Sequence, residues 1–295
     1  MSSPNPHVGI VILNWRRPEC TLACLESLQH LDYPCFEVVV VDNGSGDGST
    51  ETIRQRFPRV TVIENGRNLG FATGCNIGIT QLLRRNVDYV LLLNDDTEAD
   101  TCSLRHLVEV AESDPGIGIV GPKICYYGRP ETIWSAGGTI DQFGEARHRR
   151  VDQTDECDAD EVQDVDYVTG CALLIKRKAI ETIGLLDDRF FAYFEEAEWC
   201  ARARRRGFRV VYAPRACVWH KIEAAERTDS WVYVYLMTRN RLLYLKCIGA
   251  KPWTTALAIV GLLRTAISWS LKPRHRHMRP YSSALTRGIR DFVTR

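Results

Sequence analysis

The chain has 295 residues, a formal net charge of +1 and a hydrophobic fraction of 45%. This length suits one large α/β domain with an appendage, because single hydrophobic cores stop growing near ~250–300 residues. The near-neutral charge argues against nucleic acid as a partner, since nucleic-acid-binding domains carry a basic surface.

Short apolar runs alternate with helical patterns over the first 120 residues. Residues 8–13 form a continuous apolar run typical of a buried parallel strand, and Pro18 suits the first position of the helix that follows. Ser49 is expected to cap the second helix. The remaining expected strands cover residues 36–41, 60–63, 89–93 and 117–120, with further helices near 75–85 and 104–111. This alternation predicts βαβ units and therefore an α/β fold with a mainly parallel sheet flanked by helices.

The pattern weakens after residue 120. Residues 121–151 show no clear periodicity, and the acidic run 152–166 is expected to form a solvated, mobile loop. Order returns with a strand over residues 167–175, a helix that begins near residue 194, and a last strand over residues 209–212.

The composition changes at Trp231, where aromatic, aliphatic and basic residues mix. Residues 253–271 are long enough to cross a bilayer, which takes ~20 residues, but Arg264 lies inside them and would cost about +2.5–3.5 kcal/mol at the centre of a span. We therefore expect a helix that lies in the membrane interface, with the basic tail beyond it attracted to the anionic inner face of the cytoplasmic membrane. The alternative is a helical hairpin that packs on the catalytic domain or on a second copy of the chain, which would give a homo-oligomer.

Two observations favour a cytoplasmic protein that is peripheral to the membrane. The eleven cysteines form no C-x-x-C pair of the kind that binds zinc, and we expect them to be buried free thiols in a reducing compartment. The first seven residues are short and polar, and they lack the basic region and the cleavage site of a secretory signal.

Carboxylates follow two of the expected strands at their C-terminal ends. Asn94, Asp95 and Asp96 follow the apolar run 89–93, and Asp42 follows the second strand. Ligands of open α/β sheets bind at this edge, and a divalent cation that bridges substrate phosphates would compensate two neighbouring acids. A carboxylate at position 42 can accept hydrogen bonds from a ribose or a base. A dinucleotide site is less favoured, since the glycines that follow are spaced G-x-G-x-G and not G-x-G-x-x-G.

Three acids, Glu195, Glu196 and Glu198, open a helix directly behind the aromatic run 190–194. They could be ordinary residues that favour the helix dipole. Alternatively, one of them takes the proton of an attacking hydroxyl, and the aromatic residues form a platform for a sugar ring. His220 ends a later apolar stretch and is suited to completing a metal's ligand set, although a lone histidine is also a common structural residue.

Several motifs occur in order along residues 8–246. They are Ile12-Leu13-Asn14-Trp15, Val41-Asp42-Asn43-Gly44-Ser45, Arg67-Asn68-Leu69-Gly70-Phe71-Ala72, Leu93-Asn94-Asp95-Asp96, Val168-Thr169-Gly170-Cys171-Ala172-Leu173-Leu174, Phe191-Ala192-Tyr193-Phe194-Glu195-Glu196 and Val218-Trp219-His220. Together they resemble family-2 glycosyltransferases of the GT-A fold, and most closely the bacterial rhamnosyltransferase-like branch that builds cell-surface polysaccharides.

The resemblance implies a role for each matching residue of the donor site. Those at the nucleotide would be Asn14 and Asp42 at the nucleoside, Arg67 near the base and Asp95 near the ribose. Asp96 would bind Mg²⁺ or Mn²⁺ across the donor diphosphate, with His220 as the late histidine of the metal site. Asn94 departs from the family, because it replaces the first acid of a strict D-x-D element.

The acceptor half is matched in the same way. Glu196 would be the catalytic base, and Glu195 is a second candidate because the family more often has Glu-Asp at this point. Gly170, Cys171 and Trp199 would lie at the acceptor.

The resemblance therefore implies an inverting, metal-dependent glycosyltransferase that moves a sugar from a UDP- or dTDP-sugar to a hydroxyl of a glycan or lipid-linked acceptor. Residues 1–230 would form the catalytic domain, with a nucleotide-binding half (1–120) and an acceptor half (121–230), and residues 231–295 a helical, membrane-associated segment. The alternatives are a degenerate sugar-nucleotide-binding module without turnover, and a sugar nucleotidyltransferase. The latter should carry a glycine-rich phosphate loop where this chain has Asn14-Trp15-Arg16-Arg17-Pro18.

Overall fold

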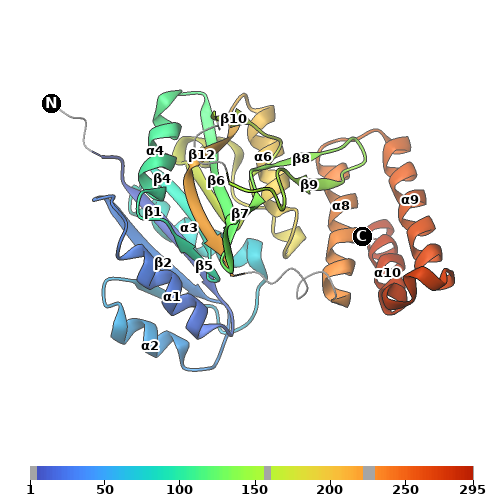
Figure 1. The fold of residues 1–295 in the computed structure, drawn as a ribbon, viewed down its shortest axis with the longest axis horizontal. Coiled ribbons are helices and arrows are strands. Elements are labelled where there is room, and N and C mark those ends of the chain that lie inside the picture. The colour runs from blue at the N-terminus through green and yellow to red at the C-terminus, as the bar shows by residue number, and fades with distance from the viewer. Residues whose placement is uncertain (1–4, 156–160, 222–229, 295) are drawn as a thin grey trace.

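A ten-stranded sheet runs through the first 220 residues of the computed structural model, which describes residues 5–155, 161–221 and 230–294 (Figure 1). The strands follow the order β10-β12-β6-β11-β4-β1-β2-β3, while β5 pairs with β12 and β7 with β6. Their bounds are β1 Val8–Asn14, β2 Phe36–Asp42, β3 Thr61–Glu64, β4 Tyr89–Asn94, β5 Thr97–Ala99, β6 Ile117–Tyr126, β7 Arg129–Ser135, β10 Gln163–Asp164, β11 Ala172–Lys176 and β12 Arg209–His220. A separate ribbon joins β8 Gly138–Ile140 to β9 Ala146–His148.

The sheet changes character at β11. Strands β3, β2, β1 and β4 pair in parallel, as expected for successive βαβ units. β11 then pairs antiparallel with both β4 and β6, and β12 runs parallel to β6. In β12 the pairing partner steps from Pro122 to its neighbour Lys123 while the strand itself advances from Ala213 to Cys217, so β12 carries a bulge.

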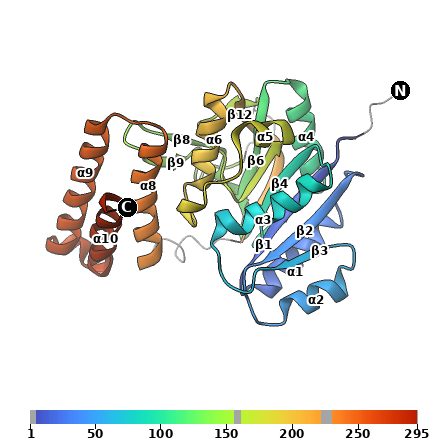
Figure 2. The same ribbon diagram turned by 180° about the vertical axis from the view of Figure 1, so that it is seen from behind.

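Helices cover both faces of the sheet (Figure 2). One face carries α1 Pro18–Leu28, α2 Ser49–Arg56 and α4 Ser103–Ser113, and the other carries α3 Phe71–Arg84, α5 Arg177–Ile183 and α6 Glu195–Arg205. The alternation of side chains along β2 fixes the two cores, because Val38 and Val40 pack on the first face and Val39 and Val41 on the second. Both faces are therefore buried, which explains the continuous apolar runs in the sequence.

The C-terminal helices form a group at one end of the sheet (Figure 1). They are α8 Trp231–Cys247, α9 Pro252–Leu271 and α10 Ser282–Val293, with the 3₁₀ segment η2 Pro273–Tyr281 before the last. Among the described helices, α9 is the one long and apolar enough to cross a membrane, and few of its residues are buried. The boundary at residue 230 stays a prediction.

Several expected elements have different bounds in the structure. Gly48 caps α2 with a left-handed backbone, so the expectation that Ser49 caps it was wrong; Ser49 is the first helical residue, and its hydroxyl accepts a hydrogen bond from Asn14. The stretch 121–151 is not irregular, because β6 continues to Tyr126 and three short strands follow. β6 shows no alternation of apolar and polar residues because it is buried along its whole length.

The later strands also differ. The strand expected over residues 167–175 begins only at Ala172, and the one expected to end at Tyr212 continues to His220. α3 begins at Phe71, before the expected start. Asp155 and Asp164, in the acidic run expected to be a mobile loop, form ion pairs with Lys123 and Arg209, while residues 156–160 of that run lie outside the described part of the chain.

Candidate active site

The parallel strands β1, β2 and β4 end level with one another. Asn14 is the register partner of Asp42, and Leu13 is the partner of Asn94. The predicted nucleotide and metal residues that follow these strands are thereby brought to one edge of the sheet, the edge at which open α/β sheets bind ligands.

Asn14 is fully buried at this edge and forms several hydrogen bonds. Its Nδ2 donates to Asp42 Oδ1 at 2.7 Å and to Ser49 Oγ at 2.9 Å, and its Oδ1 accepts from the Thr21 hydroxyl at 2.7 Å. The other carboxylate oxygen of Asp42 accepts from the backbone N–H groups of Gly44 and Ser45. Asn14 and Asp42 therefore build the loop after β2, and the carboxylate itself is 3% exposed.

Arg67 lies against that loop. A Cβ added at Gly44, whose φ is +78°, would stand 2.4 Å from the Arg67 Cα, so only glycine allows the two backbones to approach this closely. The Arg67 side chain is exposed, and Asp95 is half-buried in the turn after β4. Both predicted nucleotide contacts are thus accessible at the edge.

Asp96 lies between β4 and β5 and is bound by basic side chains from two other elements. Its Oδ2 accepts a hydrogen bond from Arg17 Nη1 at 2.8 Å, and its Oδ1 lies 2.9 Å from His220 Nε2. Asp96 and His220 are buried, whereas half of the Arg17 side chain is exposed. Because a buried carboxylate needs compensation, Arg17 supplies a cation that can move into solvent when another takes its place.

Strand pairing sets the distance between Asp96 and His220. β5 pairs antiparallel with the end of β12, so that Thr97 is opposite His220. The ring of His220 packs edge-on against Trp134, with centroids 4.9 Å apart, and Trp134 in turn contacts His148. Burial, with a smaller contribution from the charge of His220, lowers the pKa of His148 to about 4, so this second imidazole stays neutral at physiological pH.

The chemistry of these side chains fits a divalent cation that arrives with a substrate. Asp96 and His220 supply one carboxylate and one imidazole, and within the described ranges no group of three or more His, Cys, Asp or Glu side chains converges to hold a metal. Magnesium bound by one or two protein side chains keeps waters and accepts phosphate oxygens as ligands. The site is therefore suited to a metal shared with a diphosphate, and not to a self-contained metal centre.

Glu195 and Glu196 are the first two residues of α6 and lie in different surroundings. Glu195 is 4% exposed. Burial raises the pKa of the Cys75 thiol on α3, and the charge of Glu195 adds to this shift. Glu196 lies beside Gly170, because a Cβ added to Gly170 would stand 3.7 Å from the Cβ of Glu196. Among the described side chains, one oxygen of each glutamate is buried without a hydrogen-bond partner.

Burial is the main cause of the shifted pKa values of both glutamates. It raises the pKa of Glu196 to about 7, and it raises the pKa of Glu195 well above its usual range, with a further contribution from the charge of Glu196. A carboxylate with a pKa near 7 is well matched to accepting a proton at neutral pH. Glu196, which is less buried than Glu195, therefore has the basicity that the predicted base requires.

The raised pKa of Glu195 predicts a pH-dependent cost in stability. The unfolded chain ionises this carboxyl in the usual range, whereas the folded chain holds the proton to higher pH, so the free energy of unfolding falls as pH rises through that interval. We expect Glu195→Gln to raise Tm at pH 8 and to change it little at pH 5, as measured by thermal denaturation at both values. An equal shift at the two pH values would show that ionisation is not the cause.

The residues predicted at the acceptor lie in three different environments. Gly170 borders Glu196 and the ring of Phe71. Cys171 is buried, and its backbone C=O accepts from the N–H of Asn94 at 2.9 Å, so it connects the acceptor side to the metal edge.

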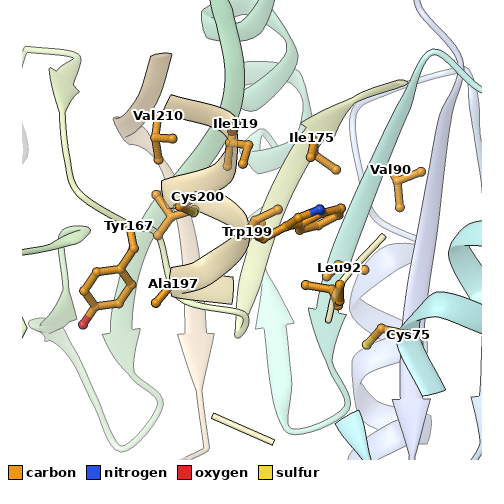
Figure 3. Close-up of a cluster of buried hydrophobic side chains, with 14 of the residues drawn as sticks. Cys75, Val90, Leu92, Ile119, Tyr167, Ile175, Ala197, Trp199, Cys200 and Val210 are labelled. Carbon is orange, nitrogen blue, oxygen red and sulfur yellow. The ribbon is translucent and has the colours of Figure 1, made fainter. Parts of the chain in front are cut away.

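Trp199 is a correction. Its side chain is fully buried in the core, where Figure 3 shows it near Ile175 and Leu92, and its indole N–H donates to the Gly184 C=O at 2.8 Å. It has no surface for an acceptor because it lies three residues beyond Glu196, at the part of α6 that faces the sheet. We assign it to core packing.

The sequence interpretation also missed Arg17. Arg17 lies after β1, where a nucleotidyltransferase would carry a glycine-rich phosphate loop, and its side chain contacts Asp96. A cation placed directly after a strand that ends at a ligand-binding edge could have indicated it.

Comparison with known proteins adds a family to this geometry. Residues 4–241 match the family described as "Glycosyltransferase like family 2". A low-salt glycan biosynthesis hexosyltransferase of Haloferax volcanii is 28% identical over 83% of this chain and 77% of its own length. An N-acetylglucosaminyl-diphospho-decaprenol L-rhamnosyltransferase of Mycobacterium tuberculosis is 30% identical over 62% of this chain and 66% of its own length.

Solved structures share the fold. A mannosyltransferase of Pyrobaculum calidifontis, in complex with GDP-mannose and Mn²⁺, superposes with a TM-score of 0.60 at 16% identity and covers 99% of this chain and 88% of its own. The transferase GalNAc-T7, with UDP, GalNAc and Mn²⁺, gives a TM-score of 0.66 at 16% identity and covers 99% and 58%. The GT-A fold expected from the sequence is confirmed, as an α/β fold with a mixed, mostly parallel sheet.

Proposed function

The chain belongs to glycosyltransferase-like family 2, and we propose that it is an inverting, metal-dependent enzyme that moves a sugar from a UDP- or dTDP-sugar to an acceptor hydroxyl in cell-surface polysaccharide synthesis. The observation that carries the proposal is the convergence of Asp96 and His220, 2.9 Å apart and buried, at the edge where Asp42 and Arg67 lie. Substrate names of the relatives suggest a lipid-linked or glycan acceptor.

Asp96 and His220 would hold Mg²⁺ or Mn²⁺, which when bound neutralises charge that grows on the departing diphosphate. Arg17, half of whose side chain is exposed, would give up its contact with Asp96 to the metal and would then be free to contact a phosphate group. The buried loop built by Asn14 and Asp42 forms one wall of the nucleoside site, and we assign Arg67 and Asp95, the accessible residues, to direct nucleotide contacts.

Glu196 acts on the acceptor. It takes the proton of the incoming hydroxyl as the oxygen attacks the anomeric carbon, and the diphosphate departs from the opposite face. One displacement of this kind inverts the anomeric centre. Glu195 is 4% exposed, so we assign the proton transfer to Glu196 and not to Glu195.

The exposed face of α9 is suited to a lipid surface. Its apolar residues are spaced three, four or seven positions apart, so they lie on one side of the helix, and each is at least half exposed: Trp253, Leu257, Val260, Ile267 and Leu271. Arg264 lies on the same face, and its long side chain can extend to lipid headgroups. Basic residues follow in η2, so we propose that α9 lies in the anionic cytoplasmic leaflet and brings the acceptor half to a membrane-bound substrate.

This placement predicts the effect of two substitutions on α9. The double variant Leu257→Ser/Ile267→Ser should lower partition into vesicles of phosphatidylglycerol and phosphatidylcholine by about 100-fold, because each of the two side chains contributes ~1.5 kcal/mol when buried in an apolar phase and about 1.4 kcal/mol is a factor of ten. Flotation of the purified protein measures it. Val151→Ser, at an exposed apolar position of the sheet domain, is the matched control and should float like the parent. Unchanged flotation of the α9 variant with lost self-association would assign the face to a second copy instead.

Release of nucleotide diphosphate tests the function itself. The protein is incubated with UDP-, dTDP- and GDP-sugars, with an acceptor extract, and with Mn²⁺ or EDTA. We expect one nucleotide class to be hydrolysed or transferred only with metal and with release of the diphosphate. Binding without release would indicate a module without turnover, and release of pyrophosphate from a nucleoside triphosphate and a sugar phosphate would indicate a nucleotidyltransferase.

A further inference from the structure

A strained turn precedes the helix that carries Glu196. Phe191, Tyr193 and Phe194 have φ values of 65°, 68° and 72°, a region that costs a non-glycine residue ~1–3 kcal/mol. At Phe191, where ψ is −61°, the N–H of Ala192 donates to the C=O of Phe190 at 2.8 Å, which makes a γ-turn of the strained, positive-φ form. Such a turn persists only where its surroundings hold it.

Asn240 on α8 holds this turn from one side. Its side chain is fully buried, and its Nδ2 donates to the C=O groups of Phe190, Ala192 and Tyr193 at 2.9, 2.7 and 2.7 Å. All three partners can only accept, so the amide nitrogen must face them, and its two hydrogens are shared among three oxygens. Arg239 Nε donates to Asn240 Oδ1 at 2.8 Å and fixes the other end of the amide.

The N-terminus of α3 holds the turn from the opposite side. The N–H groups of Phe71 and Ala72 donate to the C=O of Phe191 at 2.6 and 3.2 Å. A Cβ at Gly70 would stand 2.5 Å from the Phe191 ring, so the two segments are in close contact. Since Phe71 also borders Gly170, the turn lies between Asn240 on α8 and the predicted acceptor side.

We propose that Asn240 is a positioning residue for Glu196: its buried amide imposes the left-handed turn at 190–194 and thereby the start and direction of α6. The inference rests on the proposed function, because it takes Glu196 as the base. It also gives the C-terminal helices a part in the reaction, since α8 packs on α10 and α9 and reaches the catalytic domain through this amide.

Asn240→Leu tests the proposal because leucine has a similar volume and no donor. We expect kcat to fall by about 10–100-fold, as for a base displaced by about 1 Å, while the Kd for nucleotide diphosphate with Mn²⁺ stays within about twofold. Hydrogen exchange of amides 190–197 should become faster. Arg239→Gln, at a half-buried position that donates to the C=O groups of Arg189 and Phe190, should show a smaller loss of the same kind and serves if the leucine variant folds poorly.

A second-site change separates positioning from general stability. Phe191 is 40% exposed, and glycine accepts a positive φ freely, so Phe191→Gly should restore part of kcat in the Asn240→Leu background. Tyr235→Phe, which removes a hydrogen bond from α8 to Asp291 on α10, is the control and should leave kcat unchanged. Normal kcat in Asn240→Leu, or an equal loss of kcat and nucleotide affinity, would overturn the inference. If Glu196 were not the base, Glu196→Gln would show normal turnover. The same turnover assay therefore tests the role of Glu196 separately from the role of Asn240.

Discussion

Glu196→Gln is expected to lower kcat by ~10²–10⁴-fold, because glutamine cannot take the proton of the attacking hydroxyl. Donor binding should be unchanged, since Glu196 lies at Gly170 on the predicted acceptor side. In the parent enzyme kcat should fall as pH drops below about 7, where burial places the pKa of this carboxyl and where protonation removes the base. Steady-state kinetics over pH 5–9, with nucleotide affinity by calorimetry, measure all three.

Glu195→Gln is the control for this result. It makes the same chemical change one residue earlier, at a side chain that is only 4% exposed, and should leave kcat within a few-fold of the parent. If Glu195→Gln were inactive and Glu196→Gln active, the base would be Glu195. Near-normal turnover of both variants would remove general-base catalysis by this helix altogether.

Asp96→Ala is expected to abolish the metal dependence of nucleotide binding and to lower kcat/KM by about 10²–10³-fold, the loss typical for one electrostatic stabiliser of a departing group. The reason is that Asp96 is the buried carboxylate paired with His220 at the edge where we propose that the diphosphate binds. Titration of UDP and dTDP with and without Mn²⁺, followed by fluorescence or calorimetry, measures the effect independently of turnover.

Arg17→Gln should have the opposite effect to Asp96→Ala at the proposed metal site. It removes the cation that occupies Asp96 Oδ2 without removing a ligand, so Mn²⁺ affinity should be equal to or higher than in the parent. Intact metal-dependent affinity in Asp96→Ala would contradict the proposed site. Loss of Mn²⁺ affinity in Arg17→Gln would contradict the proposal that the metal replaces Arg17 at Asp96, because the arginine would then help to bind the metal.

The parallel half of the fold, and the meeting of its polar strand-end residues at one edge, could be predicted from sequence because they depend on local pattern. Apolar runs buried on both faces give the strands, and the polar residues Asn14, Asp42 and Asp96 that end them must then lie together. The antiparallel β11 and the long β12 could not be predicted in the same way, because pairing between distant segments leaves no periodic pattern in either.

The environment of individual side chains was harder to predict. Trp199 follows the predicted base by three residues, and only the direction of α6 decides that it packs in the core. The contacts of Arg17 with Asp96 and of Asn240 with the turn span 79 and about 50 residues, respectively. Such polar contacts are specified by tertiary geometry, so a single sequence shows the residue types without their partners.

The bulge in β12 makes this enzyme sensitive to the length of one short stretch. Residues 214–216 separate Ala213 from Cys217 while their partners Pro122 and Lys123 are adjacent, and side chains alternate between faces with a period of two. A deletion there that shifted the pairing of residues 217–220 by one position would exchange the orientations of Trp219 and His220 and bring an indole to the carboxylate that now meets an imidazole. A register shift of this kind would therefore separate His220 from Asp96 although every proposed site residue remained in the sequence.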